Sequence, residues 1–258
     1  MQPEPEKKLG IMQPYFFPYP GYFQLLHAVD TLVFYDDVNF IKNGWINRNR
    51  LLLDGAPAYF TVPLANASSF QRIDQVRVSA DGGWRRKLLE KMRHAYARAP
   101  HYTEVIRMVE GVVGSEPPSI GELARQSVQA VAQYLALPCR FVATSRAYGN
   151  DHLKGEERVI DICIREHAAT YINVPGGRML YEPRHFARQQ VRLGFINPRL
   201  ATYPQFSGAH VPALSIIDLL MFNDRQAARD LLRNYSVEFP PDRSLPDAGL
   251  IDVASRPE

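Results

Sequence analysis

The stretch LGIMQPYFFPYPGYFQLLHAVDTLVFYDD, residues 9–37, decides the fold of this chain. A short apolar run at residues 9–12 leads into residues 13–22, where three prolines and five aromatic side chains make a rigid turn. A helix that begins at Gly21 then points unpaired backbone N–H groups, and the positive end of its dipole, at its surroundings. A second apolar run at residues 31–35 follows. The pattern predicts a strand-loop-helix-strand unit with a place for an anion.

This unit predicts where a ligand binds. A crossover through one helix places its two strands parallel, and ligands of such sheets bind beyond the carboxyl ends of the strands. Gln13, Asp36 and Asp37 follow the two expected strands, so all three are expected at that edge. Gly21, Tyr15 and Tyr22 are expected to help hold an anionic group beside the helix start.

The rest of the chain alternates between strand and helix patterns, and an Asp54-Gly55 turn between apolar runs predicts a β-hairpin. We therefore predict an α/β, Rossmann-like fold, with a mostly parallel sheet flanked by helices and a β-hairpin insertion. Further strands are expected at residues 72–78, 140–144 and 170–174, and helices at 84–98, 102–113, 119–135, 156–167, 183–190 and 214–234, the last broken near 223.

The length of 258 residues fits one large domain. We expect a single domain at residues 9–237. Residues 1–8 are polar and read as a flexible N-terminus. Residues 238–258 contain four prolines and no periodicity, which is typical of a disordered tail.

Composition narrows the class of partner. Thirty basic against 27 acidic side chains give a net charge of +3, too small for a protein that mainly wraps nucleic acid. The two cysteines have no framework spacing, and the seven histidines have no metal-ligand spacing, so neither a disulfide scaffold nor a metal site is expected. There is no signal sequence or membrane-spanning run, and we predict a cytoplasmic protein.

Asp36 and Asp37 end the second strand, where alternating side chains allow only one of them to face a ligand. One carboxylate could accept a proton from a sugar amine or bind a ribose hydroxyl. The alternative is an Asx turn or a cap. Among the histidines His152 is the best placed for acid–base work, although an exposed loop position is the preferred account of it.

A dense polar segment around one large aromatic separates the second strand from the hairpin. Lys42 and Arg48 could clamp a diphosphate, and Trp45 could stack on a base or a sugar. Asn47 and Asn49 could form hydrogen bonds with hydroxyl groups of a ligand. The alternative is a surface loop in which Trp45 is a packing anchor.

Ser215 precedes the last helix and could bind phosphate or carboxylate together with Tyr203 and Gln205 from the preceding loop, or simply cap that helix. The basic helix at 84–98 reads as a solvated face, since no RNA-binding motif accompanies it.

Five motifs together resemble the WbqC-like protein family. They are residues 11–15, 18–23, 35–38, 45–49 and 214–218. The resemblance extends over roughly residues 9 to 235. It implies a role in bacterial surface-polysaccharide synthesis, because members of this family are associated with O-antigen gene clusters, and one has been suggested to transfer glycine onto an amino sugar.

A second resemblance is to the nucleotidyltransferase and class I synthetase superfamily, whose first loop ends in His-x-Gly-His. Here the same place reads Tyr19-Pro20-Gly21-Tyr22. Tyrosine donates a hydrogen bond to phosphate but brings no positive charge. The similarity raises ATP with magnesium as a candidate cofactor.

The sequence therefore predicts an enzyme that acylates or aminoacylates, with glycine as one option, the amino group of a nucleotide-linked amino sugar. The expected partners are that sugar and an activated acyl or aminoacyl donor, with tRNA as one carrier of the donor. Two alternatives remain open: a non-catalytic nucleotide-sugar-binding or scaffold protein, and a nucleotidyltransferase.

Overall fold

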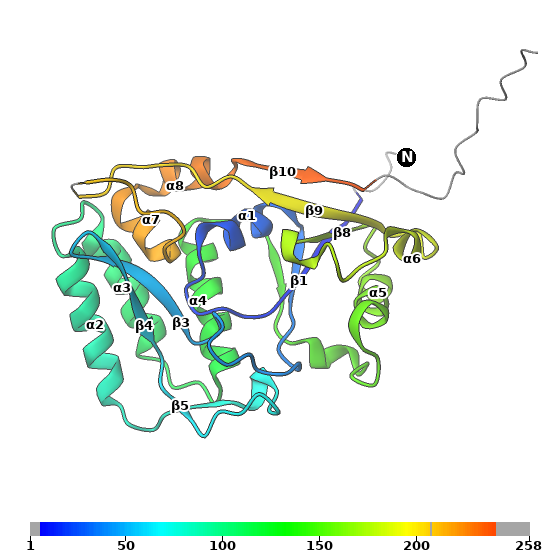
Figure 1. The fold of residues 1–258 in the computed structure, drawn as a ribbon, viewed down its shortest axis with the longest axis horizontal. Coiled ribbons are helices and arrows are strands. Elements are labelled where there is room, and N and C mark those ends of the chain that lie inside the picture. Colours follow the sequence, from blue (N-terminus) through cyan, green and yellow to red (C-terminus); the bar gives the residue numbers. More distant parts are fainter. Residues whose placement is uncertain (1–5, 207, 241–258) are drawn as a thin grey trace, which may run out of the picture.

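A six-stranded sheet divides the protein into two layers of helices in the computed structural model, which describes residues 6–206 and 208–240 (Figure 1). The strands of this sheet are β1 (Lys8–Met12), β2 (Thr31–Phe34), β7 (Arg140–Val142), β8 (Thr170–Asn173), β9 (Arg192–Pro198) and β10 (Tyr235–Glu238). The spatial order is β10-β9-β8-β1-β2-β7, with only β10 antiparallel to its neighbour. Read from β7, the order is the 3-2-1-4-5-6 of a Rossmann fold, so the predicted fold class is confirmed.

Two separate cores lie on the two faces of the sheet. Leu9, Ile11 and Val33 pack with α5 (Gly155–Arg165) and α6 (Pro183–Ala187) on one face. Leu32 and Phe34 point to the larger core on the other face. The helices of this larger core are α1 (Pro20–Ala28), α2 (Gly83–Tyr96), α3 (Tyr102–Val113), α4 (Ile120–Tyr134), α7 (Ile216–Phe222) and α8 (Arg225–Leu232). The alternation of strand side chains thus buries both faces, as parallel sheets require.

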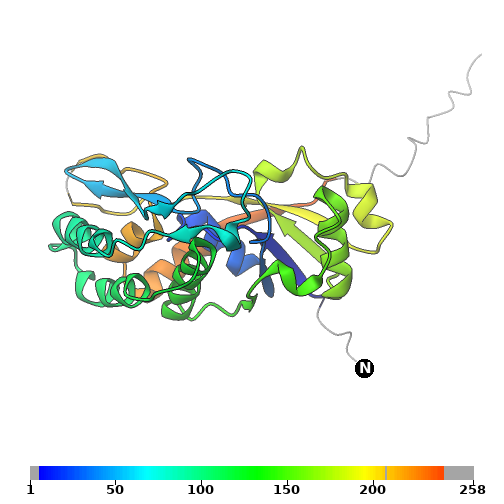
Figure 2. The same ribbon diagram turned by 90° about the horizontal axis from the view of Figure 1, so that it is seen from below.

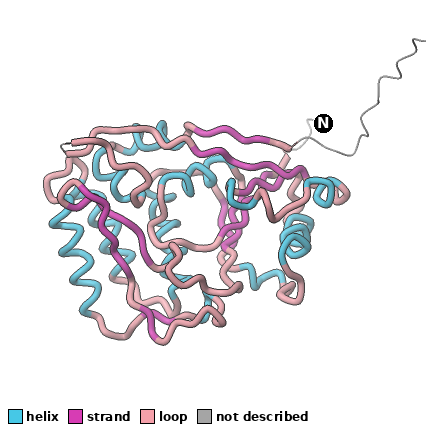
Figure 3. Tube along the Cα trace, viewed as in Figure 1, coloured by secondary structure: helices cyan, strands magenta, loops and turns pink. Residues whose placement is uncertain are grey.

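A β-hairpin stands apart from the sheet, alongside α2 and α3, as Figure 3 shows by the separate pair of strands. It consists of β3 (Arg48–Leu53) and β4 (Ala56–Thr61), and a second small pair joins β5 (Leu64–Ala65) to β6 (Arg77–Val78). Asp54 and Gly55 both have positive φ, 51° and 77°, as the two central residues of a type I′ turn require. The predicted hairpin is confirmed.

Several boundaries differ from the sequence expectation. Residues 73–75 form a 3₁₀ turn, so only Arg77–Val78 of the expected strand at 72–78 belongs to a strand. Two further 3₁₀ turns, Ser145–Tyr148 and Pro175–Gly177, follow β7 and β8. Strand β10 includes Glu238, one residue beyond the expected domain end, and residues 241–258 of the expected tail lie outside the described residues.

Strand β9 was not predicted, although it lies inside the sheet between β8 and β10. Its Gly194 breaks the apolar pattern that marks a strand. The structure explains the glycine, because a Cβ there would lie 2.8 Å from the ring of Phe239, which packs against the strand. Seen from below in Figure 2, α2 and α3 lie at one end of the molecule and α5 and α6 at the other.

Candidate functional site

The order in which the chain adds strands to the sheet reverses between β1 and β8. From β1 the chain builds outward through β2 to β7, then returns to the other side of β1 for β8 and β9. Ligands of open α/β sheets bind in the crevice outside the carboxyl ends of the strands at this switch point. Gln13 follows β1 and Asn173 ends β8, so two amide side chains flank the crevice.

Gln13 is not satisfied by the protein. Its Oε1 is buried and has no hydrogen-bond partner among the described residues. Its own carbonyl is held by the Tyr22 hydroxyl at 3.0 Å, so the backbone at this point is fixed while the side chain is left without a partner. A buried polar atom without a partner is costly, and a bound ligand is one way to remove that cost.

Asp36 and Asp37 follow β2, and the structure gives them different surroundings. Asp37 Oδ2 accepts a 2.6 Å hydrogen bond from Arg158 Nη2, and both side chains are almost completely buried. Arg158 comes from α5, donates at 2.9 Å to Asn150 Oδ1, and lies 5.0 Å from the centre of the Tyr35 ring. The carboxylate of Asp37 is therefore neutralised by a dedicated cation.

Asp36 has no such cation. Its Oδ1 accepts hydrogen bonds from the Thr144 hydroxyl at 2.8 Å and the Ser145 amide at 3.1 Å, both on the segment after β7. No described residue hydrogen-bonds its Oδ2. Burial raises the pKa of Asp36, against the opposing effect of these hydrogen bonds, and nearby Asp74 raises it further. Thr144 and Ser145 thus fix the Asp36 carboxylate through Oδ1, its pKa is raised, and its Oδ2 has no hydrogen-bond partner in the described part of the chain.

Ser145 joins the two aspartates. Its hydroxyl contacts Asp37 Oδ1 and lies 3.4 Å from Asp36 Oδ1. The Asp36 amide in turn donates to the Ser145 hydroxyl at 3.3 Å. The network from Arg158 through Asp37 and Ser145 to Asp36 therefore connects α5 with the edge of the sheet.

A second feature is a cavity of about 310 Å³, which we call the hairpin cavity. It lies between the proline-rich turn of residues 13–22 and the β3–β4 hairpin. It is lined by Tyr15, Pro18, Tyr19, Trp45, Asn49, Arg50 and Ala213. The loops meet because the Phe16 amide donates to the Ile46 carbonyl at 3.1 Å. Three of the predicted binding residues, Tyr15, Trp45 and Asn49, thus come together here.

Two arginines flank a pair of stacked aromatic rings beside this cavity. The Arg50 guanidinium lies 5.6 Å from the Trp45 ring centre, Trp45 stacks on Tyr59 at 6.3 Å, and Arg48 lies 4.9 Å from the Tyr59 ring centre. Arg48 donates to the Gly44 carbonyl and Arg50 to the Ala213 carbonyl. Neither forms an ion pair with any carboxylate of residues 6–206 or 208–240, so both charges are available to an anion.

Other predicted residues have structural partners. Asn47 Nδ2 donates to the Val62 carbonyl at 2.9 Å and Asn49 Nδ2 to the Phe17 carbonyl at 2.9 Å. Lys42 is exposed on the loop before the hairpin. Their binding roles stay predictions, and the two asparagines are already engaged in holding their loops.

At the start of α1 the Tyr19 ring lies against Gly21, and the predicted anion site there stays a prediction. A Cβ at Gly21 would lie 2.4 Å from the Tyr19 ring, so only glycine lets that ring cover the helix start. Tyr22 is 1% exposed, and its hydroxyl faces the Gln13 carbonyl. Tyr22 therefore positions Gln13 and has no free hydroxyl for a phosphate.

Ser215 is fully buried, donates to the Phe17 carbonyl at 2.7 Å and caps α7 through the Ile217 amide at 3.3 Å. Tyr203 and Gln205 both donate to Asp218 Oδ1 at 2.7 Å. The binding roles predicted for Ser215, Tyr203 and Gln205 stay predictions, and each of the three side chains already has a partner within the protein.

Asp218 was missed by sequence reasoning, although it is the centre of this buried network. Its other oxygen accepts from the Tyr96 hydroxyl at 2.8 Å, and Tyr96 accepts from the Leu52 amide at 2.8 Å. Burial raises the pKa of Asp218. The network ties the hairpin to α2 and α7.

Tyr96→Phe is expected to destabilise the protein by about 1–3 kcal/mol, because it leaves a buried amide and a buried carboxylate oxygen without partners. Urea unfolding would measure this. Tyr134→Phe, which removes a hydroxyl from an exposed pair, is the control and should change stability by less than about 0.5 kcal/mol. Equal effects of the two substitutions would contradict the role of the network.

Arg158, Ser145, Thr144 and Arg50 were also missed. Arg158 could have been noticed, since it lies one turn before Ile162 on the apolar face of its helix. Arg50 lies two residues after Arg48, on the same face of β3. Thr144 and Ser145 gave no signal, because their role depends on β7 lying beside β2.

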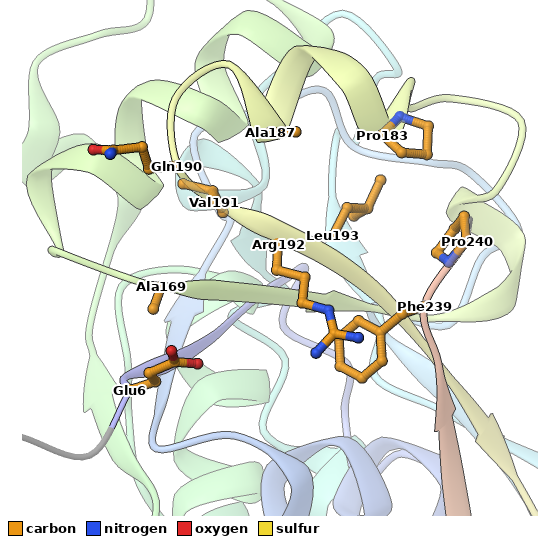
Figure 4. A pocket seen from close by; sticks show the side chains of 10 residues that line it. All are labelled: Glu6, Ala169, Pro183, Ala187, Gln190, Val191, Arg192, Leu193, Phe239 and Pro240. Carbon is orange, nitrogen blue, oxygen red and sulfur yellow. The ribbon is translucent and has the colours of Figure 1, made fainter. Parts of the chain in front are cut away.

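Another cavity, of about 650 Å³, lies elsewhere. Figure 4 shows Arg192 over the Phe239 ring, with Ala169 and Glu6 to the left. Ala169 and Arg192 stand at the amino ends of β8 and β9. This cavity is therefore at the opposite edge of the sheet from Gln13 and Asp36.

The fold defines a Rossmann-type α/β protein whose switch point lies between the strands that end near Gln13 and Asn173. Residues 13–230 match the WbqC-like protein family, and the chain belongs to this family. It is 28% identical over 231 residues to the uncharacterized protein Rv1507c of Mycobacterium tuberculosis (strain ATCC 25618 / H37Rv), an alignment that covers 88% of this chain and 98% of that protein. No solved structure matches the chain.

Two expected absences concern only the described residues. None of the helices within 6–206 and 208–240 is both long and apolar enough to cross a bilayer. The same residues contain no cluster of three or more potential metal ligands.

Proposed function

We propose that this protein transfers an acyl or aminoacyl group onto the amino group of a nucleotide-linked amino sugar in bacterial surface-polysaccharide (O-antigen) synthesis. The observation that carries the proposal is Asp36, a carboxylate with a raised pKa and an unused oxygen at the ligand edge of a Rossmann-type sheet. The association of WbqC-like proteins with O-antigen gene clusters supports the substrate class.

In the proposed reaction, the sugar nitrogen attacks the carbonyl carbon of the donor. A new C–N bond forms, the bond from that carbon to the donor's leaving group breaks, and Asp36 Oδ2 takes the proton that the nitrogen loses. A general base is most effective when its pKa lies near the working pH, and burial moves Asp36 in that direction.

The surroundings supply orientation and charge. Thr144 and Ser145 hold Asp36 through Oδ1, so Oδ2 is directed by two fixed donors. Arg158 neutralises Asp37, so the neighbouring carboxylate does not add a second unpaired charge. Gln13 would bind a polar group of the substrate, and Lys42 and Arg48 would attract its phosphates.

Direct transfer tests the proposal. The protein is incubated with a panel of nucleotide-linked amino sugars, in one arm with amino acids, ATP and magnesium, and in the other with acyl thioesters or aminoacyl-tRNA. We expect the mass of one sugar to increase by one acyl group. Thermal stabilisation by a nucleotide sugar without product from any donor would instead identify a binding or scaffold protein.

Pyrophosphate exchange with ATP, magnesium and amino acids separates the two kinds of donor. Exchange would show that the protein activates its own acyl group, while a folded protein without exchange would use a donor made elsewhere. The buried Tyr22 argues against the nucleotidyltransferase alternative, because its hydroxyl holds the Gln13 carbonyl rather than facing a phosphate.

A further inference from the structure

The hairpin cavity contains an uncompensated cation among aromatic rings. Arg50 lines it together with Tyr15, Tyr19 and Trp45. Its Nη2 donates to the Ala213 carbonyl at 3.1 Å, while its Nε is buried without any acceptor in the described part of the chain. A guanidinium stacked on an indole with an unsatisfied N–H is well suited to an oxyanion.

The walls indicate what carries that oxyanion. Trp45 is 39% exposed and offers a flat apolar face, and the Tyr15 and Tyr19 rings form further sides. Burial raises the pKa of both tyrosines, so they remain neutral hydroxyls that do not repel an anion. The ligand therefore combines one negative group with a body that stacks on an aromatic ring.

The size of the cavity limits the ligand. About 310 Å³ is at the lower end of the range of ligand pockets, which suits a single sugar or amino acid rather than a whole nucleotide sugar. Arg50 is the one arginine or lysine in the lining, so one singly charged group is favoured over a diphosphate.

We propose that the hairpin cavity binds a small organic carboxylate, with its carboxylate on Arg50 and its body against Trp45. Two sources share this chemistry: a hexuronic acid and a free α-amino acid. The inference deepens the proposed function, since the ligand would be the sugar end of the acceptor or the acid that becomes the acyl group.

The test is direct binding of matched pairs of ligands to the full chain, measured by calorimetry. Glucuronate is compared with glucose, and leucine with leucinamide. We expect saturable binding of one carboxylate, and binding at least about tenfold weaker of its match that lacks the carboxylate, the effect of losing a charged hydrogen bond. The pair that binds identifies the source.

Variants locate the binding. Arg50→Gln is expected to weaken it about tenfold to a hundredfold. Arg50→Lys keeps the charge but loses the planar guanidinium, so its affinity is expected to lie between that of the unsubstituted protein and that of Arg50→Gln. Trp45→Leu should also weaken binding, while Arg107→Gln, an exposed arginine on α3, is the matched control and should not.

Three results would overturn the inference. They are binding of neither carboxylate, equal binding of a carboxylate and its match without one, and normal binding by folded Arg50→Gln. Trp45→Leu and Arg50→Lys decide the matter if Arg50→Gln does not fold. Asp36→Asn separates this inference from the proposed function: it should lower kcat for transfer by about 10²–10⁴-fold and leave carboxylate binding unchanged. Carboxylate binding by a protein that never transfers would refute only the proposed function.

Discussion

Asp36→Asn is expected to lower kcat for acyl transfer by about 10²–10⁴-fold, the usual contribution of a positioned general base. The asparagine keeps the size of the side chain and can still accept from Thr144 and the Ser145 amide through its oxygen. It cannot take a proton from the sugar amine. Steady-state kinetics with circular dichroism to confirm folding would measure the change.

The pH dependence gives a second measurement on the same residue. Asp36 must be a carboxylate to act as a base, so activity should fall as the pH drops through its pKa. Because burial raises that pKa, the acid limb of the kcat profile is expected at a higher pH than for an ordinary aspartate. The residual activity of Asp36→Asn should lack this limb.

Asp37→Asn is a poor control because it disturbs Arg158, so Asp74→Asn is the better one. Asp74 raises the pKa of Asp36 by its charge. Removing that charge should move the acid limb to lower pH and leave kcat at high pH nearly unchanged. An Asp36→Asn protein that is folded and fully active would exclude Asp36 as the base.

The elements that were predicted from the sequence have local signals, whereas strand β9, with Gly194 in its apolar run, was not predicted. The strand-loop-helix-strand pattern of residues 9–37 predicts β1, α1 and β2, and Asp54-Gly55 predicts the hairpin. Ser119 with Glu122 predicts the start of α4, where the Ser119 hydroxyl accepts from the Glu122 amide at 3.2 Å. These elements follow from neighbours within a few residues.

The site could be predicted only in part because its contacts are distant in sequence. Asp36 and Asp37 were placed at the edge of the sheet from the strand that precedes them, but their difference depends on Arg158 and Ser145, more than one hundred residues away. Likewise Tyr203 and Gln205 were expected at a ligand, and Asp218 in the last helix binds them instead. Pairings of this kind have no local pattern.

Arg158→Met is expected to destabilise the protein by about 3–5 kcal/mol, the cost of removing one partner from a buried ion pair. The two side chains are 4% and 1% exposed, so water cannot replace the lost guanidinium beside Asp37. Asn150 Oδ1 also loses its donor. Urea unfolding at neutral pH would measure the loss.

The same helix supplies the matched control. Arg165 forms an ion pair of 2.7 Å with Asp161, but its side chain is 51% exposed. Exposed pairs contribute about 0–1 kcal/mol, so Arg165→Met should have little effect. Similar losses for Arg158→Met and Arg165→Met would show that burial of the Asp37 pair is not what matters.

A double substitution separates the pair from the packing of Arg158. Replacing Asp37 with Asn in the Arg158→Met protein removes the uncompensated charge, so the double variant should be more stable than Arg158→Met alone. Its activity then tests the connection to Asp36. Since Ser145 contacts both carboxylates, loss of Asp37 frees the hydroxyl that helps hold Asp36, and a lower kcat in a stable double variant would show that the buried pair positions the proposed base.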